Sequence, residues 1–169
     1  MKAAVIKPIG VVHTNVSEED IKCSLQGVRG AIEVFEEFSE GLEGIEGFSH
    51  LFVIAFLDRV TEEQRKVLRV KFRRLVRFGF SLTELPEVGV FCSDSPHRPN
   101  PIALTIVRLI ERKDRFLKVD NLDLYDGTPV LDLKPYTPDR RVDDLKLPEW
   151  YRRIASRVSE FSGLKKPSI

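Results

Sequence analysis

Residues 49–56 read SHLFVIAF, an almost unbroken run of apolar side chains. Such a run is typical of a strand buried on both faces, although periodicity alone does not separate it from a buried helix. Residues 102–110 read IALTIVRLI and are apolar at both alternating sets of positions until Arg108. Two such runs in one chain favour the central strands of a sheet.

Five further segments have the composition of strands. Residues 3–13 are rich in valine and isoleucine and are interrupted by Pro8, as in an edge strand or a bent strand. The others are short and cover residues 31–35, 88–92, 116–119 and 129–133. Short strands separated by turn residues favour a β-barrel or a β-sandwich over a doubly wound α/β fold.

Two segments favour helices beside this β-structure. Thr61 precedes two glutamates and a glutamine, which is the pattern of an N-cap followed by an acidic first turn. Near the C-terminus, apolar residues at roughly helical spacing follow Pro148: Trp150, Ile154, Val158 and Phe161. They predict an amphipathic helix that packs on the barrel or on a second subunit.

Length and composition favour one folded domain in the cytoplasm. The 169 residues suffice for one hydrophobic core, and a net charge of +1 argues against a wholly basic nucleic-acid binder. No apolar run reaches the length of a membrane span, and Lys7 and Pro8 interrupt any signal-peptide core. Cys23 and Cys92 are too few for a disulfide framework and are expected to be ordinary cytosolic thiols.

The near-neutral total conceals an uneven distribution of charge. Residues 17–46 contain nine acids and two bases, whereas residues 65–77, here called the basic segment, contain seven bases and no acid. A solvated surface explains the basic segment as well as a phosphate-contacting patch does. Phe72 and Phe78 lie in or beside it and are expected to belong to the core rather than to stack on bases.

Two loops carry the residues suited to ligand binding. Residues 93–101 read SDSPHRPNP, and the prolines stiffen a loop that presents serine, histidine, arginine and asparagine. Such a loop can hold a polar ligand with little ordering cost, although a rigid polar turn is the alternative. Residues 126–129 read DGTP, where Asp126 could accept hydrogen bonds from ribose hydroxyls or an amine and Gly127 would allow close approach.

Other kinds of site are not supported. Asp94, Ser95 and His97 are the residue types of a hydrolase triad, but neighbours on an extended loop do not point at one another. The histidines and cysteines lack the spacing of metal ligands, so no metal is expected.

At these two loops the chain resembles a known family. The strings SPHRPNPI at residues 95–102 and DGTPVLDLKPY at residues 126–136 are similar to those of the TsaA-like or TrmO family of S-adenosylmethionine-dependent tRNA adenine-N6 methyltransferases. The strings PIGVVH at 8–13, IEVF at 32–35 and GFSH at 47–50 follow in the family's order. The resemblance runs from about residue 8 to residue 138, which is nearly the whole chain.

The resemblance implies a mainly β protein, namely a small single-sheet β-barrel with a few peripheral helices. Residues 1–138 would form the barrel domain and residues 139–169 a C-terminal helical tail. The cofactor would be S-adenosylmethionine, bound near a homodimer interface, and no metal would be needed. The reaction implied is methylation of the N6 amine of a threonylcarbamoyl-modified adenosine beside the anticodon of a threonine tRNA.

Carried over by position, the family's cofactor contacts fall in five places. The residues are Leu25, Gln26, Asp58, Arg59, Asp94, Leu104, Asp126, Gly127 and Thr128, to which we add Arg98 and Asn100. Arg98 is assigned to the cofactor carboxylate or a phosphate, and Asn100 to the shape of its loop. The anticodon arm is assigned to five bases of the basic segment: Arg69, Lys71, Arg73, Arg74 and Arg77.

The chain also departs from the family's pattern. Ser93-Asp94 replaces Thr-Arg, Ser24-Leu25-Gln26 replaces Pro-Arg-Gln, and Asp58 replaces histidine. The further C-terminal domain of bacterial members has no counterpart in the sequence given. The lost arginines favour an alternative function, in which the barrel binds the cofactor or RNA without catalysis. A third hypothesis, a metal or serine hydrolase, is supported only by the clustering of polar residues.

Overall fold

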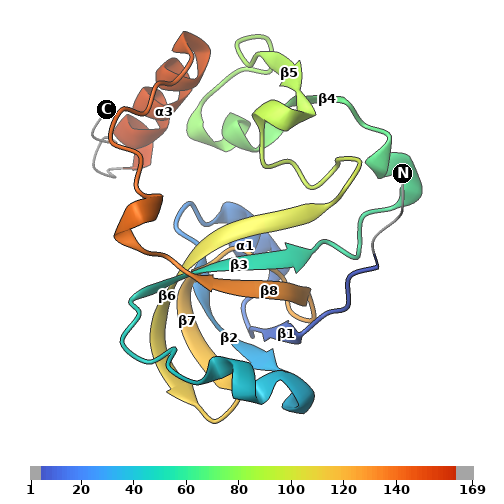
Figure 1. The fold of residues 1–169 in the computed structure, drawn as a ribbon. Helices are drawn as coiled ribbons and strands as arrows, with labels where there is room; N and C mark the ends of the chain where they lie inside the picture. The colour runs from blue at the N-terminus through green and yellow to red at the C-terminus, as the bar shows by residue number, and fades with distance from the viewer. Residues whose placement is uncertain (1–4, 163–169) are drawn as a thin grey trace.

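Six antiparallel strands close into one barrel in this computed structural model, which describes residues 5–162 (Figure 1). Their order around the barrel is β1-β2-β7-β6-β3-β8. The strands are β1 (Gly10–His13), β2 (Val28–Val34), β3 (His50–Phe56), β6 (Ile102–Lys113), β7 (Phe116–Leu122) and β8 (Pro129–Pro135). The mainly β prediction and the single-sheet barrel are confirmed, and the sandwich alternative is wrong.

The barrel interior is a packed apolar core. Strand β3 pairs with β6 from His50 opposite Arg108 to Phe56 opposite Ile102, and it pairs with β8 on its other side. Alternation along each strand points one set of side chains inward. The most deeply buried are Val12, Ile32, Val34, Leu51, Val53, Ala55, Val107, Leu117, Val119, Leu122 and Val130.

The outer face of the central strands corrects one expectation. Both apolar runs were expected to be buried on both faces, but only their inward residues are. On β6 the outward residues Ile102, Leu104 and Ile106 are exposed, and Leu104 retains 64% of its accessible surface. A closed barrel buries only its interior face. The apolar outer face of β6 could therefore be buried only by packing against something outside the barrel.

Two other segments differ from the sequence prediction. The strand expected over residues 3–13 begins only at Gly10, and its first two positions lie outside the described residues. Pro8 has no N–H to donate to a strand ladder, so regular pairing does not extend through it. The next residue, Ile9, donates its N–H to Val130 O at 2.8 Å, just before β1 begins. The strand expected over 88–92 is the short β5 (Glu87–Gly89), followed by the 3-10 turn η3 (Val90–Cys92).

Antiparallel pairing separates the loops into two ends. Strands β1, β3 and β7 finish where β2, β6 and β8 begin, and this end of the barrel is here called the site end. It carries α1 (Glu18–Cys23), whose N-cap Ser17 accepts a hydrogen bond from Asp20 N. The opposite end carries η1 (Glu36–Leu42). α2 (Glu62–Arg65) follows β3 and begins with the expected capping residue, Thr61, in a capping box with Gln64.

A small second unit lies beyond the site end (Figure 1). It contains β4 (Arg69–Lys71), paired with β5, and η2 (Arg73–Phe78), against which α3 (Glu149–Ser162) packs. We call it the basic lobe. Its own core is Phe78, Phe80 and Leu85, with Leu75, Ile154 and Val158 packed against them.

The expected C-terminal helix is therefore present, and it packs on η2 of the basic segment. The side chain of Phe161 and residues 163–169 lie outside the description. The turn η4 (Pro138–Arg140) connects the barrel to this part of the chain, and the domain division after residue 138 stays a prediction. Among residues 5–162, no helix is both long and apolar enough to cross a membrane.

Candidate functional site at one end of the barrel

The residues assigned to the cofactor gather at the site end. Leu25 and Gln26 follow α1, Asp58 and Arg59 follow β3, and the loop 93–101 leads into β6. Residues 126–128 join β7 to β8, while Leu104 lies on the outer face of β6 two positions into the strand. The topology thus brings together residues separated by up to a hundred positions, and two groups of them, beside the proline-rich loop and Asp58, are linked by hydrogen bonds or line one depression.

The first group is centred on Asp126. Its Oδ1 atom accepts a hydrogen bond from Thr14 N at 3.0 Å, and its backbone oxygen accepts one from Arg59 Nη2 at 2.8 Å. Asp126 is exposed, and its second carboxylate oxygen makes no hydrogen bond within the described part of the chain. This oxygen is available to a hydroxyl or amine donor.

The loop around Asp126 is held by the barrel backbone. The N–H of Gly127 donates to Val12 O at 2.9 Å, and Val12 N donates to Thr128 O at 3.0 Å. Gly127 has a φ of +79°, a conformation that favours glycine, and Thr128 is buried. The loop therefore presents Asp126 from a fixed backbone.

Arg59 ties this loop to α1. Its Nη1 donates to Glu18 Oε1, and its guanidinium lies 5.7 Å from the centre of the Tyr125 ring. Sequence reasoning missed Thr14, Glu18 and Tyr125 as members of the site. Glu18 lies 41 residues from Arg59, and neither residue belongs to a motif that would have linked them.

The second group lines an open, polar depression of about 520 Å³. Its walls are Ser24, Leu25, Gln26, Gly27, Arg74, Thr105, Ile106, Asn121 and Asp123. Arg74 Nη2 donates to Ser24 O at 2.8 Å, and Ser24 Oγ donates to Gly27 O at 2.6 Å. The turn at Leu25 and Gln26 is thereby fixed, and exposed Leu104 adjoins Thr105 in this wall.

The proline-rich loop is stiffened by its own side chains. Arg98 Nη1 donates to Ser93 O at 3.0 Å, while Asn100 O accepts from Ile102 N at 2.8 Å. Asp94 and Asn100 are exposed, as is Asp58 beyond β3. One nitrogen of Arg98 is thus occupied within its loop, and its assignment to the cofactor carboxylate stays a prediction.

The five bases assigned to tRNA do not form one uniform patch. Arg69 pairs with Glu87 at 2.7 Å. Arg74 and Arg77 donate to the carbonyls of Ser24 and Lys22, which belong to the C-terminal end of α1 and need donors there. Lys71 and Arg73 are exposed and have no hydrogen bond or ion pair among the described residues.

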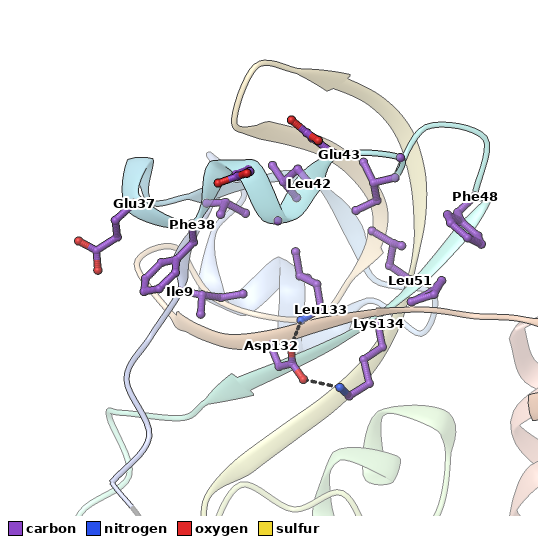
Figure 2. Close-up of a pocket in the computed structure, with 16 residues that line it drawn as sticks. Ile9, Glu37, Phe38, Leu42, Glu43, Phe48, Leu51, Asp132, Leu133 and Lys134 are labelled. Atoms are coloured by element: carbon purple, nitrogen blue, oxygen red, sulfur yellow. Dashed lines mark hydrogen bonds and ion pairs between the residues drawn. The ribbon is translucent and has the colours of Figure 1, made fainter.

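A larger pocket lies at the opposite end of the barrel, between η1 and β8 (Figure 2). Its volume is about 680 Å³, and its floor is apolar, with Leu51 and Leu133 among the lining residues. Glu37 and Glu43 also line it, and Asp132 pairs with Lys134 at 2.7 Å. None of the residues assigned to the cofactor lines this pocket, and no sequence motif indicated it.

The described residues contain no group of three or more histidine, cysteine, aspartate or glutamate side chains placed to hold a metal ion.

Comparison with known proteins connects this architecture to one family. A family model described as the tRNA-methyltransferase O N-terminal domain matches residues 19–143. A "Probable S-adenosyl-L-methionine-binding protein" of Pyrococcus abyssi is 39% identical over 79% of this chain and 68% of its own. The "tRNA (adenine(37)-N6)-methyltransferase" of Escherichia coli is 53% identical over 30% of this chain, which spans 23% of that protein.

A crystal structure of TrmO from Pseudomonas aeruginosa has a similar fold. The TM-score is 0.61 at 26% identity, over 86% of this chain and 61% of that one. The β-barrel with the same overall arrangement is therefore shared with a solved structure.

Proposed function

Because the chain belongs to the family of tRNA-methyltransferase O N-terminal domains, we propose that it is an S-adenosylmethionine-dependent methyltransferase that acts on tRNA. The acceptor is the N6 amine of a threonylcarbamoyl-modified adenosine beside the anticodon. The observation that carries this proposal is the convergence of the family's separate cofactor segments at the site end. A tRNA substrate is consistent with the cytoplasmic location expected from the sequence.

The residues of the site end suit the parts of this cofactor. The free oxygen of Asp126 can accept hydrogen bonds from ribose hydroxyls, as its charge makes it a strong acceptor. Leu25 and Leu104 offer apolar surface to the adenine or the methionine chain, and Gln26 offers an amide. Arg98, the arginine of the loop 93–101, is assigned to the cofactor carboxylate.

Methyl transfer from S-adenosylmethionine requires mainly that the methyl group and the acceptor amine are correctly positioned. The bound sulfonium supplies an activated methyl group, so the chain's residues accelerate transfer chiefly by holding methyl and amine in line. Arg59 serves as a positioning residue in this proposal, because it fixes the Asp126 loop and α1 against each other. The structure assigns no residue to accept the amine proton.

A second function is favoured by the lost family arginines. Asp94 and Leu25 stand where the resemblance described for the sequence leads us to expect arginine, so the alternative is a barrel that binds the cofactor without transferring its methyl group. Arg59 occupies neither place, since its guanidinium is engaged by Glu18 and Asp126.

A methyl-transfer assay separates the two functions. The full chain is incubated with labelled S-adenosylmethionine and threonine tRNA that carries the threonylcarbamoyl modification but lacks the methyl group. We expect label in that tRNA and none in tRNA lacking the threonylcarbamoyl group. Cofactor binding by calorimetry with no label in either tRNA would instead support the binding module.

A homodimer is part of this proposal. The outer face of β6 exposes Ile102, Leu104 and Ile106 in one row, and contiguous apolar surface of this kind marks an interaction site. The row adjoins the open depression at Leu25, so a second copy would both cover the apolar row and close the depression.

Leu104→Glu should make the protein monomeric, because it places a charge in the centre of the proposed interface. Light scattering coupled to size-exclusion chromatography measures the mass directly. Val142→Glu is the matched control, since Val142 is equally exposed but lies outside the barrel. A wild-type protein that is already monomeric at all concentrations contradicts the dimer.

A further inference from the structure

The stacked contact between Phe72 and Trp150 joins two parts of the chain into one surface. The ring centres are 5.7 Å apart and the planes are inclined by 30°. Phe72 immediately precedes η2, and Trp150 lies in the first turn of α3. This contact lies where η2 and α3 pack side by side (Figure 1), so it joins the residues that follow β4 to the start of α3.

Four exposed cations are chain neighbours of the two rings. Lys71, Arg73, Arg152 and Arg153 are all exposed, and the side chain of none of them makes a hydrogen bond or a salt bridge within the described part of the chain. Other bases in or beside the lobe are engaged: Arg69 pairs with Glu87, Arg157 of α3 pairs with Glu84, and Lys66 at the end of α2 pairs with Glu63. The hydrogen bond from Arg69 lowers the pKa of Glu87, and the charge of Lys71, which lies opposite Glu87 across the β4–β5 pair, lowers it further. Glu87 therefore stays charged and partly offsets the charge of Lys71. Glu149 is the exposed acid at the start of α3.

An exposed aromatic ring directly precedes two of these cations on α3. Tyr151 contacts the edge of Trp150, with ring centres 5.6 Å apart, and 43% of its surface is accessible. Phe72 and Trp150 are half-buried, so Tyr151 is the ring of this group that a ligand can reach from solvent. A reachable aromatic ring among unpaired cations is the arrangement that binds single-stranded nucleic acid, through base stacking and phosphate contacts.

Arg157 holds α3 in this position. Its guanidinium lies 4.3 Å from the centre of the Phe80 ring, pairs with Glu84 at 3.1 Å and donates to Gly79 O. Ile154 and Val158 pack on the lobe core beside it. α3 is thus fixed to the basic lobe by contacts that do not involve the side chains of Arg152 and Arg153, while Tyr151 contributes an edge contact with Trp150.

We propose that α3 and residues 71–73 form one binding surface for a single-stranded RNA loop, in which Tyr151 stacks on an unpaired base while Lys71, Arg73, Arg152 and Arg153 contact phosphates. This surface rests on the proposed tRNA substrate and names how its loop is held. Residues 71–73 lie within residues 19–143, which match the family model, whereas α3 lies outside them. The proposed surface therefore combines a segment that the family model covers with one that it does not cover.

The full chain is titrated with a fluorescent anticodon stem-loop RNA at several salt concentrations. Arg152→Ala combined with Arg153→Ala should weaken binding and lower the slope of log K against log salt by about 1.4, because each lost phosphate contact on single strands removes about 0.7. Tyr151→Ala should weaken binding about 5- to 100-fold with an unchanged salt slope, since stacking releases no ions. Tyr151→Phe should retain the wild-type affinity.

The matched control is Lys7→Ala combined with Lys113→Ala. It removes the same charge at two exposed bases outside the lobe. If this pair weakens RNA binding as much as the α3 pair does, binding depends only on net charge and the proposal is overturned.

Trp150 provides an independent readout, because it is the single tryptophan of the chain. RNA that stacks on Tyr151 should quench its fluorescence. RNA binding detected by anisotropy without any change in this emission would place the RNA elsewhere.

Two further outcomes separate the failure of the proposed tRNA substrate from the failure of the proposed RNA-binding surface. Wild-type protein that binds S-adenosylmethionine but no RNA contradicts both the tRNA substrate and this surface. Wild-type protein that methylates tRNA while the α3 and Tyr151 variants retain full RNA affinity contradicts the surface alone. Binding to vesicles of anionic lipid in place of RNA would assign the cations to a membrane surface and equally overturn the proposal.

Discussion

Asp126→Ala should weaken S-adenosylmethionine binding by about 10- to 100-fold. The substitution removes a charged acceptor from a fixed loop, and hydrogen bonds to charged groups contribute roughly 1.5–3 kcal/mol. Isothermal titration calorimetry on the full chain measures the dissociation constant directly. The expected loss follows from the position of Asp126, whose Oδ1 is engaged by Thr14 while the second oxygen faces solvent.

Two comparison variants make this test specific. Asp126→Asn keeps an acceptor for Thr14 N but turns the other oxygen into a donor, so it should weaken binding with little change in melting temperature. Asp132→Ala removes an aspartate from the opposite end of the barrel, where it pairs with Lys134, and should leave the affinity unchanged. Weaker binding in Asp132→Ala with normal binding in both Asp126 variants would move the cofactor to the pocket beneath η1.

The strands could be predicted because their signal is local. The apolar runs at 49–56 and 102–110 correspond to β3 and the first part of β6, which bury Leu51, Val53 and Val107 in the barrel. The error concerned the faces of the strands. Hydropathy reports that Ile102, Leu104 and Ile106 are apolar, but it cannot report that a closed barrel turns them outward.

The candidate site could be predicted from the sequence only in part. The DGTP and SPHRPNP strings are contiguous, so the sequence could identify both loops. The contacts of Arg59 with Glu18 and with Asp126 O depend on which loops meet at one end of the barrel. The basic segment shows the same limit, because charge density cannot separate Arg74 and Arg77, which bind carbonyls near the end of α1, from unpaired Lys71 and Arg73.

The barrel and the basic lobe have separate apolar cores of different size. Among the residues whose burial is described, the barrel core contains thirteen buried residues, whereas the core of the basic lobe contains three. Three buried residues supply too little apolar burial for independent stability. The lobe therefore depends on α3 and on the hydrogen bonds of Arg74 and Arg77 to the α1 region, and we expect it to open before the barrel does.

Leu117→Ala and Leu85→Ala should separate these two units. Leu117 is fully buried in β7, and its truncation should lower the free energy of unfolding by about 2–5 kcal/mol, a large part of a typical domain's stability. Leu85→Ala should loosen only the lobe. Denaturant unfolding is followed by Trp150 fluorescence for the lobe and by far-ultraviolet circular dichroism for the barrel. In Leu117→Ala the circular dichroism transition should move to lower denaturant concentration, and the fluorescence transition should move with it once the barrel would otherwise unfold first, because the lobe cannot outlast the barrel. In Leu85→Ala only the fluorescence transition should shift, and coincident transitions there would show that barrel and lobe unfold as one unit.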